Sequence, residues 1–270
     1  MIDYHLHTHL CGHASGKLDE YVREGEKAGL AEIGFADHFP LEVMEFKPAM
    51  PVTMKSRELP RYVEEVQQAT QNASLPVKLG AEVDYLPGKT EKALEIIGQH
   101  PFDYIIGSVH FIGEWDCTHP FYRQEFERRS LEQVYQSYFE LIRGACRSGM
   151  FDIIGHADAV KKFGYRITPE QARPLYRETA RVLAETGVCL EVNTAGLDAP
   201  AGEIYPERDL LRECIREGVE ITVGSDAHDP GEVARHFDRA REILLEEGVS
   251  RLAVFNGRRR SFYQLKKAGE

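Results

Sequence analysis

This sequence of 270 residues has no paired cysteine motif, no long apolar run and fewer basic than acidic residues. Its five cysteines are an odd number and include no CxxC pair, which argues against a disulfide framework and against a cysteine-based zinc site. No apolar run reaches the length that spans a membrane. The chain starts directly with the strand-like stretch MIDYHLH, which leaves no room for a signal peptide. We therefore expect a cytoplasmic protein with no membrane partner.

The charge balance is acidic, since 44 Asp and Glu residues outnumber 33 Lys and Arg residues and give a formal net charge of −11. Proteins that bind nucleic acids usually present a basic face. The basic cluster at residues 258–260 is short and is more typical of a solvated helix or turn. We expect no nucleic-acid partner, and the sequence leaves the oligomeric state open.

Strand-like segments alternate with helical patterns along the chain. The seven strand candidates are residues 2–5, 32–36, 77–83, 104–109, 152–154, 188–192 and 220–223. Several are nearly continuous runs of β-branched or aromatic residues, which is typical of strands buried on both faces in a parallel sheet. This alternation predicts an α/β fold, with a (β/α) barrel as the favoured architecture. A last apolar run at 252–255 leaves open whether there is an eighth strand.

Helix signals lie between these strands. Residues 131–147 place apolar side chains at the i, i+3, i+4, i+7 spacing of an amphipathic helix. Pro169 after Thr168 predicts a helix start, and Gly187 stands where that helix should end. Two connections, residues 39–60 and 111–130, are longer than barrel turns require, and long loops on one face of a barrel are usually functional.

Metal-competent side chains follow six of the predicted strands, beginning with the histidine-rich stretch MIDYHLHTHLCGH. The carboxyl ends of parallel barrel strands meet on one face, so these side chains should converge. Alternation along an extended strand sends His5 and His7 to the same side. Imidazoles and carboxylates without thiolates suit zinc, iron or manganese in an open site, rather than a closed structural zinc site.

These motifs, in this order, resemble the PHP (polymerase and histidinol phosphatase) superfamily. The HxH pair and the histidine after it correspond to His5, His7 and His13. The later motifs correspond to His38, Glu82, His110, His156, Asp226 and His228. The resemblance covers residues 2 to about 228 and implies a single PHP metal-dependent phosphoesterase domain over residues 1–270. It also implies a distorted (β/α)7 TIM-like barrel, with the metal site at the carboxyl ends of the strands.

The resemblance further implies three divalent metal ions, which would be Zn, Mn or Fe. One ion would bind His5, His7, Glu82 and Asp226. A second would share Glu82 as a bridge and add His110 and His156, and a third would bind His13, His38 and His228. Ions bridged in this way lie roughly 3.5–4 Å apart and lower the pKa of a bound water to about 7, which provides the nucleophile.

The stretches GSVHFIGEWDCTHP, GHADAVKKFGYR, LEVNTAGL and GSDAH resemble the stand-alone histidinol-phosphatase branch. That branch hydrolyses L-histidinol phosphate to L-histidinol and phosphate in histidine biosynthesis, so the implied partner is a small phosphorylated metabolite. The alternative within hydrolases is a phosphoesterase for another small phosphomonoester or a nucleotide. A metal-binding module without catalysis is the third hypothesis, and the complete ligand set argues against it.

Other residues receive roles from their positions beside these motifs. Glu82 and Asp226 are expected to act in catalysis through the metals. Asp37 and Asp158 neighbour ligand histidines and are candidates for orienting an imidazole or protonating the leaving group. The candidates for binding the phosphate or the rest of the substrate are Lys161, Lys162, Arg166, His9, Trp115 and Asp198. Asp198 stands where the branch often has a basic residue, and an acidic side chain there suits a substrate ammonium group.

Overall fold

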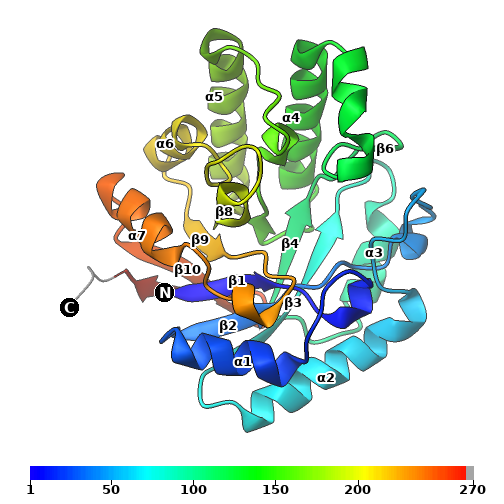
Figure 1. Ribbon diagram of the computed structural model, residues 1–270, viewed down its shortest axis with the longest axis vertical. Coiled ribbons are helices and arrows are strands. Elements are labelled where there is room, and N and C mark those ends of the chain that lie inside the picture. The colour runs from blue at the N-terminus through cyan, green and yellow to red at the C-terminus, as the bar shows by residue number, and fades with distance from the viewer. Residues whose placement is uncertain (266–270) are drawn as a thin grey trace.

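In the computed structural model, which describes residues 1–265, seven parallel strands curve into a nearly closed barrel (Figure 1). The strands, in sheet order, are β1 (Ile2–Leu6), β2 (Glu32–Phe35), β3 (Val77–Asp84), β4 (Tyr104–Ser108), β7 (Ile153–Ile154), β8 (Cys189–Asn193) and β9 (Ile221–Gly224). The barrel closes beside β1, where the His7 N–H donates to the Ala227 carbonyl at 2.9 Å. The predicted TIM-like (β/α)7 barrel is confirmed.

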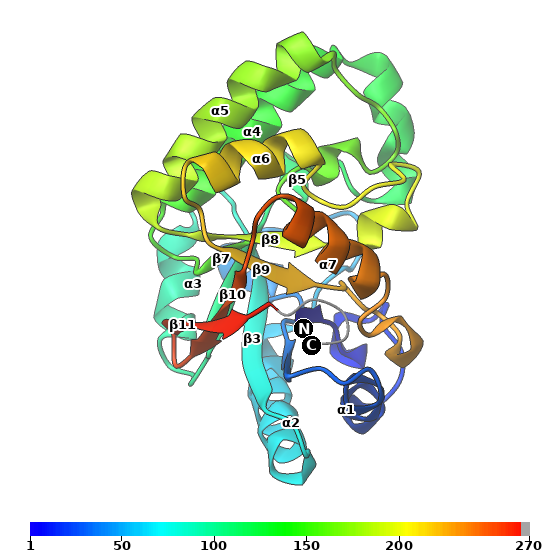
Figure 2. The same cartoon turned by 90° about the vertical axis from the view of Figure 1, so that its left-hand side faces the viewer.

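Within residues 1–265, seven α-helices surround this sheet (Figures 1 and 2). They are α1 (Leu18–Lys27), α2 (Leu59–Asn72), α3 (Thr90–Ile97), α4 (Leu131–Arg147), α5 (Pro169–Thr186), α6 (Arg208–Arg216) and α7 (Phe237–Glu246). The α5 helix starts at Pro169 as predicted, because the Thr168 side chain accepts the Gln171 N–H at 3.4 Å and caps it. It ends at Gly187, whose left-handed φ of 70° suits glycine. None of the helices described within residues 1–265 is both long and apolar enough to cross a membrane.

The apolar run at 252–255 does not form an eighth barrel strand. It belongs to β10 (Arg251–Asn256), which pairs antiparallel with β11 (Arg259–Gln264) in a separate hairpin. This hairpin lies at the amino ends of the barrel strands (Figure 2), where the Gly257 N–H donates to Asp103 at 2.9 Å. The predicted domain extends to residue 270, and its residues 266–270 lie outside the described part of the chain.

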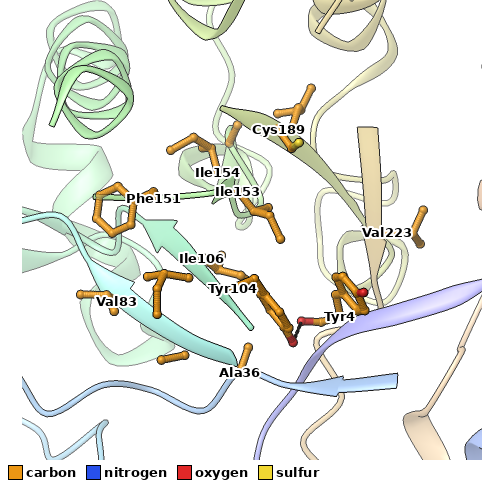
Figure 3. Packing of buried hydrophobic residues seen from close by; sticks show 14 of the residues in the cluster. Tyr4, Ala36, Val83, Tyr104, Ile106, Phe151, Ile153, Ile154, Cys189 and Val223 are labelled. Carbon is orange, nitrogen blue, oxygen red and sulfur yellow. Dashed lines mark hydrogen bonds between the residues drawn. The ribbon is translucent and has the colours of Figure 1, made fainter. Parts of the chain in front are cut away.

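Aromatic residues fill the amino-terminal half of the barrel. The Tyr104 ring stacks on Tyr4 with centroids 4.6 Å apart, and its hydroxyl donates to the Tyr4 carbonyl at 2.7 Å (Figure 3). Gly80 on β3 leaves room for this ring, because a Cβ at that position would overlap the Tyr104 side chain. Burial of each such large side chain stabilises the fold by about 1.5–3 kcal/mol.

The two long connections leave the carboxyl ends of β2 and β4. Residues 39–60 contain two short 3-10 helices, Leu41–Met44 and Ser56–Glu58. Residues 111–130 contain a small hairpin of β5 (Phe111–Ile112) and β6 (Trp115–Asp116), followed by a 3-10 helix, Pro120–Arg128. Both connections therefore lie on the side of the barrel where the predicted ligands are.

Candidate metal centre and active site

The structure brings the nine predicted ligands into one connected cluster at the carboxyl ends of the strands. Glu82, near the end of β3, lies at its centre and is buried. Five imidazole nitrogens lie within 4 Å of its oxygens: His38 Nδ1 at 2.7 Å, His156 Nε2 at 2.9 Å, His5 Nε2 at 3.5 Å, His110 Nε2 at 3.6 Å and His7 Nε2 at 3.8 Å. Burial alone would raise the pKa of Glu82, but the imidazoles of His38, His5 and His110 outweigh it and hold this pKa well below its ordinary value.

Asp226 is the second carboxylate of the cluster. Its Oδ1 lies 3.1 Å from His7 Nε2 and 3.9 Å from His5 Nε2. Burial opposes its ionisation, but these histidines and His228 together hold the pKa of Asp226 well below its ordinary value. The site therefore presents two ionised carboxylates among seven imidazoles.

Two of the ligand positions have unusual backbone conformations. Asp226 has φ 56° and His156 has φ 24°, a region that residues other than glycine seldom adopt. The Arg235 guanidinium supports the first of these turns by donating to the carbonyls of Ser225 at 3.1 Å and Asp226 at 3.2 Å. Backbone strain of this kind persists where surrounding contacts enforce it, and it clusters at functional sites.

Two acidic residues that the sequence analysis missed orient the ligand histidines. Glu191 on β8 lies 2.7 Å from His5 Nδ1 and accepts the His156 N–H at 2.8 Å. Asp84 on β3 lies 2.8 Å from His110 Nδ1. Each carboxylate fixes its imidazole so that Nε2 faces Glu82. The available signal was an acidic residue inside a buried strand, near that strand's carboxyl end.

Gly224 at the end of β9 makes the contact between His5 and Glu191 possible. A Cβ at this position would overlap the Glu191 carboxylate and the His5 Cβ. The glycine in the GSDAH stretch therefore has a packing role beside the candidate metal ligands.

The donor set fits divalent metal ions. His5 Nε2 is buried and has no hydrogen-bond partner, although it faces the centre of the cluster, 3.5 Å from Glu82. Several groups of potential ligands have donor atoms within 4.8 Å of one another, among them His5, His7 and Glu82; His5, His156 and Asp226; and His7, His38 and His228. Imidazole nitrogen with carboxylate oxygen suits Zn, Mn or Fe.

The third predicted ligand set, His13, His38 and His228, differs from these groups in detail. His38 and His228 lie together with His7, whereas His13 is grouped with His228 and Cys11. His13 Nε2 and His228 Nε2 are 3.1 Å apart. Burial, together with neighbouring imidazoles, lowers the pKa of His13 to about 4 and that of His228 to about 2. Both rings are therefore neutral near pH 7, the form in which histidine binds metals.

A cavity of about 610 Å³ opens directly onto the cluster. Six of the predicted ligands line it: His13, His38, His110, His156, Asp226 and His228. The two long connections contribute walls, with Met50 and Val52 from the first and Phe111, Asp116 and His119 from the second. The volume suits a small metabolite.

Only one of the three predicted phosphate-binding cations reaches this cavity, and it is Lys162. Lys161 is buried, and its Nζ lies 2.8 Å from Asp158 and 3.1 Å from Glu203. Arg166 pairs with the same carboxylate, and its guanidinium lies 2.6 Å from Glu203 Oε1. Lys161 and Arg166 are thus held in ion pairs away from the cavity, which corrects their expected direct contact with phosphate. Asp158 faces Lys161 rather than the metal cluster.

Three further predicted substrate contacts also lie away from the cavity. His9 is exposed, because β1 ends before it and the strand alternation does not reach it. Trp115 is buried against Phe126, with ring centroids 4.7 Å apart. Asp198 pairs with His236 at 2.8 Å. Their side chains therefore do not line this cavity.

Asp37 lies inside the cluster but has no free access to a substrate. Its carboxylate accepts the Thr8 hydroxyl and the His38 N–H, and it lies 3.5 Å from His7 Nδ1. This arrangement suits a residue that orients His7, the first of the two roles that the sequence suggested.

Known proteins are similar to this one along most of the chain. The PHP domain model matches residues 3–195. A probable histidinol-phosphatase of Deinococcus radiodurans is 43% identical over 247 residues, which cover 90% of this chain and 92% of that protein. The histidinol-phosphatase of Bacillus subtilis is 30% identical, covering 87% of this chain and 96% of that one.

Among solved structures, the fold is similar to the histidinol phosphate phosphatase of Lactococcus lactis, crystallised with zinc, L-histidinol and phosphate. The TM-score is 0.81 at 27% sequence identity, and the alignment covers 96% of this chain and 98% of that one. The matched residues 3–195 include seven of the nine clustered ligands, all except Asp226 and His228. With more than half of its length matched and the ligands gathered on one face of the barrel, this chain belongs to the PHP domain family.

Proposed function

We propose that this protein hydrolyses L-histidinol phosphate to L-histidinol and phosphate, using divalent metal ions bound at the Glu82–Asp226 cluster. The observation that carries the proposal is the set of imidazoles around these two ionised carboxylates, at one end of a cavity large enough for a small phosphomonoester. The names of the relatives support the same substrate. A cytoplasmic location and the lack of a nucleic-acid partner remain predictions from the sequence.

Different residues of the cluster would bind the metal ions and orient the ligand histidines. Glu82 and Asp226 would hold the cations together with the surrounding imidazoles, while Glu191 and Asp84 fix the orientation of His5 and His110. Divalent ions bound there would act as Lewis acids toward the phosphoryl oxygens and would activate a water molecule. The three ions expected from the family resemblance are part of this proposal.

The cavity walls offer groups for the rest of the substrate. The Lys162 ammonium is the cation we propose for the phosphate, because it lines the cavity. Asp116 carries a carboxylate into the same wall, where its Oδ1 is held by the Thr118 and His119 N–H groups at 2.9 Å each. We assign it to the substrate amino group. His119 Nδ1 accepts the Phe121 N–H at 3.2 Å, so its Nε2 remains available as a donor to the substrate.

A panel of phosphorylated metabolites tests the substrate. We expect kcat/KM on L-histidinol phosphate to be at least ~100-fold above that on sugar phosphates and nucleotides, the discrimination that a few buried polar contacts supply. A nucleotide or sugar phosphate that outperforms L-histidinol phosphate would favour the alternative, a phosphoesterase for another small metabolite.

Metal removal tests the centre itself. Elemental analysis of the purified protein should find two to three transition-metal ions per chain, a range based on the three ions that the resemblance implies. Dialysis against a chelator should abolish activity, and Zn, Mn or Fe should restore it. An active preparation without metal would contradict the proposal.

A further inference from the structure

Lys161 is the only lysine among the fully buried polar residues of the described chain, with 1% of its surface exposed. Its Nζ lies 2.8 Å from Asp158 Oδ2 and 3.1 Å from Glu203 Oε1, and it donates to the Ile204 carbonyl at 3.0 Å. Lysine is almost never fully buried unless it is paired. These contacts occupy the ammonium group, so it is not free to bind a ligand.

Arg166 binds the same segment from the outside. Its guanidinium lies 2.6 Å from Glu203 and 3.0 Å from Glu207, and it donates to the Ala201 carbonyl at 3.0 Å. The Glu207 N–H in turn donates to Asp158 at 2.8 Å. Residues 201–207 are therefore fastened to residues 158–166 by two cations that share one carboxylate. We call Asp158, Lys161, Arg166 and Glu203 the fastening network.

The two segments that the fastening network joins both form walls of the cavity. Tyr205 and Lys162 line it. The Lys161 ammonium lies 5.4 Å from the centroid of the Tyr205 ring, and this ring lies 6.5 Å from that of His156. The Lys162 carbonyl accepts the Ala201 N–H at 3.1 Å. A shift of residues 201–207 would therefore move Tyr205 and change the backbone contact that positions Lys162.

We propose that the fastening network positions Lys162 and Tyr205 for phosphate and substrate binding, with Lys161, Arg166 and Glu203 acting as positioning residues. The proposal rests on the proposed function, because it assumes that phosphate binds beside Lys162. It explains why two basic residues so close to Lys162 are buried or paired. The ion pairs of Lys161 and Arg166 hold the cavity wall in place, and Lys162 is the residue of the three that lines the cavity.

Glu203→Gln is the test variant, because both Lys161 and Arg166 pair with the Glu203 carboxylate. The Glu203 side chain is 34% exposed, so we expect the variant to fold. We expect the KM for L-histidinol phosphate to rise about tenfold with kcat changed less than about twofold. Tenfold is at the lower end of what loss of an orienting contact costs in metal sites. The Kd of inorganic phosphate, measured by calorimetry on the metal-loaded protein, should rise by a similar factor.

Glu220→Gln is the matched control. Glu220 pairs with Arg251 at 2.6 Å, its side chain is 25% exposed, and it lies outside the cavity and the fastening network. Its KM and phosphate Kd should equal those of the wild type. Arg166→Gln, a second variant at a partly exposed position, should behave as Glu203→Gln does, so that a folding defect in one variant does not decide the result.

A merely structural role would lower the melting temperature and the apparent kcat while leaving KM and phosphate Kd unchanged, and that result would overturn the inference. Unchanged constants in both Glu203→Gln and Arg166→Gln would also overturn it. Failure of the proposed function has a different signature, since the wild type and Glu220→Gln would then not turn over L-histidinol phosphate. The phosphate Kd values decide the inference even in that case.

Discussion

The two ends of the barrel differ in what their buried residues do. At the carboxyl end, imidazoles and carboxylates crowd around Glu82, and buried atoms such as His5 Nε2 lack a hydrogen-bond partner. At the amino end, aromatic rings stack, and the Tyr4 hydroxyl accepts the Phe255 N–H at 3.0 Å while the Tyr4 carbonyl accepts the Tyr104 hydroxyl at 2.7 Å. The same strands thus supply a candidate reactive site at one end and packing at the other.

The difference has a physical cost. A buried polar group without a partner destabilises a fold by about 1–3 kcal/mol, whereas packed aromatic side chains stabilise it. Metal ions bound among the imidazoles and carboxylates would stabilise the carboxyl end, whereas the amino end is stabilised by its own side chains and by the β10–β11 hairpin. We therefore expect substitutions at the carboxyl end to change activity and metal content, and substitutions at the amino end to change the free energy of unfolding.

The largest effect should come from Glu82→Gln. The change removes the charge that five imidazole nitrogens surround. We expect kcat/KM to fall by more than about 100-fold and the metal content to drop, since even residues that only orient metal ligands contribute 10- to 100-fold. Without metal, the variant should be less stable than the metal-free wild type, because the imidazoles that hold the pKa of Glu82 well below its ordinary value stabilise its ionised form in the folded protein. Kinetics, elemental analysis and thermal melts after chelation measure these three quantities.

His9→Ala is the matched control for Glu82→Gln, since His9 is exposed and lies outside the cluster. It should change kcat/KM by less than about twofold, as surface substitutions usually do. Equal losses from the two variants would mean that Glu82 is not the centre of the metal site.

The next effect in size should come from Glu191→Gln. Glu191 lies 2.7 Å from His5 Nδ1, and a neutral amide there weakens the orientation of the ring without removing a ligand. We expect kcat/KM to fall by about 10- to 100-fold, with partial recovery at raised metal concentration. Metal titrations of activity measure both. A loss that exceeds that of Glu82→Gln would reverse the ranking of the two carboxylates.

The smallest effect should come from Tyr104→Phe at the amino end. The change removes the hydrogen bond to the Tyr4 carbonyl and keeps the ring stacked on Tyr4. We expect a loss of about 1 kcal/mol in the free energy of unfolding, measured with urea, and no change in kcat/KM. A clear fall in activity at unchanged metal content would show that the two ends are coupled.

Much of the fold could be predicted from local patterns. The 131–147 helix has the bounds expected from its apolar spacing, and Pro169 and Gly187 mark the ends of α5 as expected. The exception was the run at 252–255, whose pattern is that of any buried strand. Its pairing with β11 depends on the turn between the two strands and on the contacts of the hairpin. The spacing of apolar residues along the sequence carries no information about either.

Most of the candidate ligands were predictable because they lie at or just after the carboxyl ends of strands, which a parallel barrel brings together, whereas His13 was expected only from the family resemblance. The types of donor group gathered in the cluster could therefore be predicted from the sequence. Only the tertiary structure decided that Lys162 reaches the cavity while Lys161 is buried, and that Glu191 rather than Asp158 orients a ligand histidine. Both outcomes involve carboxylates more than thirty residues away along the chain: Glu203, which joins the nearby Asp158 in pairing with Lys161, and Glu191, which contacts His5 and the His156 N–H. A charged side chain can be buried only where an oppositely charged group pairs with it. When that group is distant along the chain, its position depends on how the whole barrel closes.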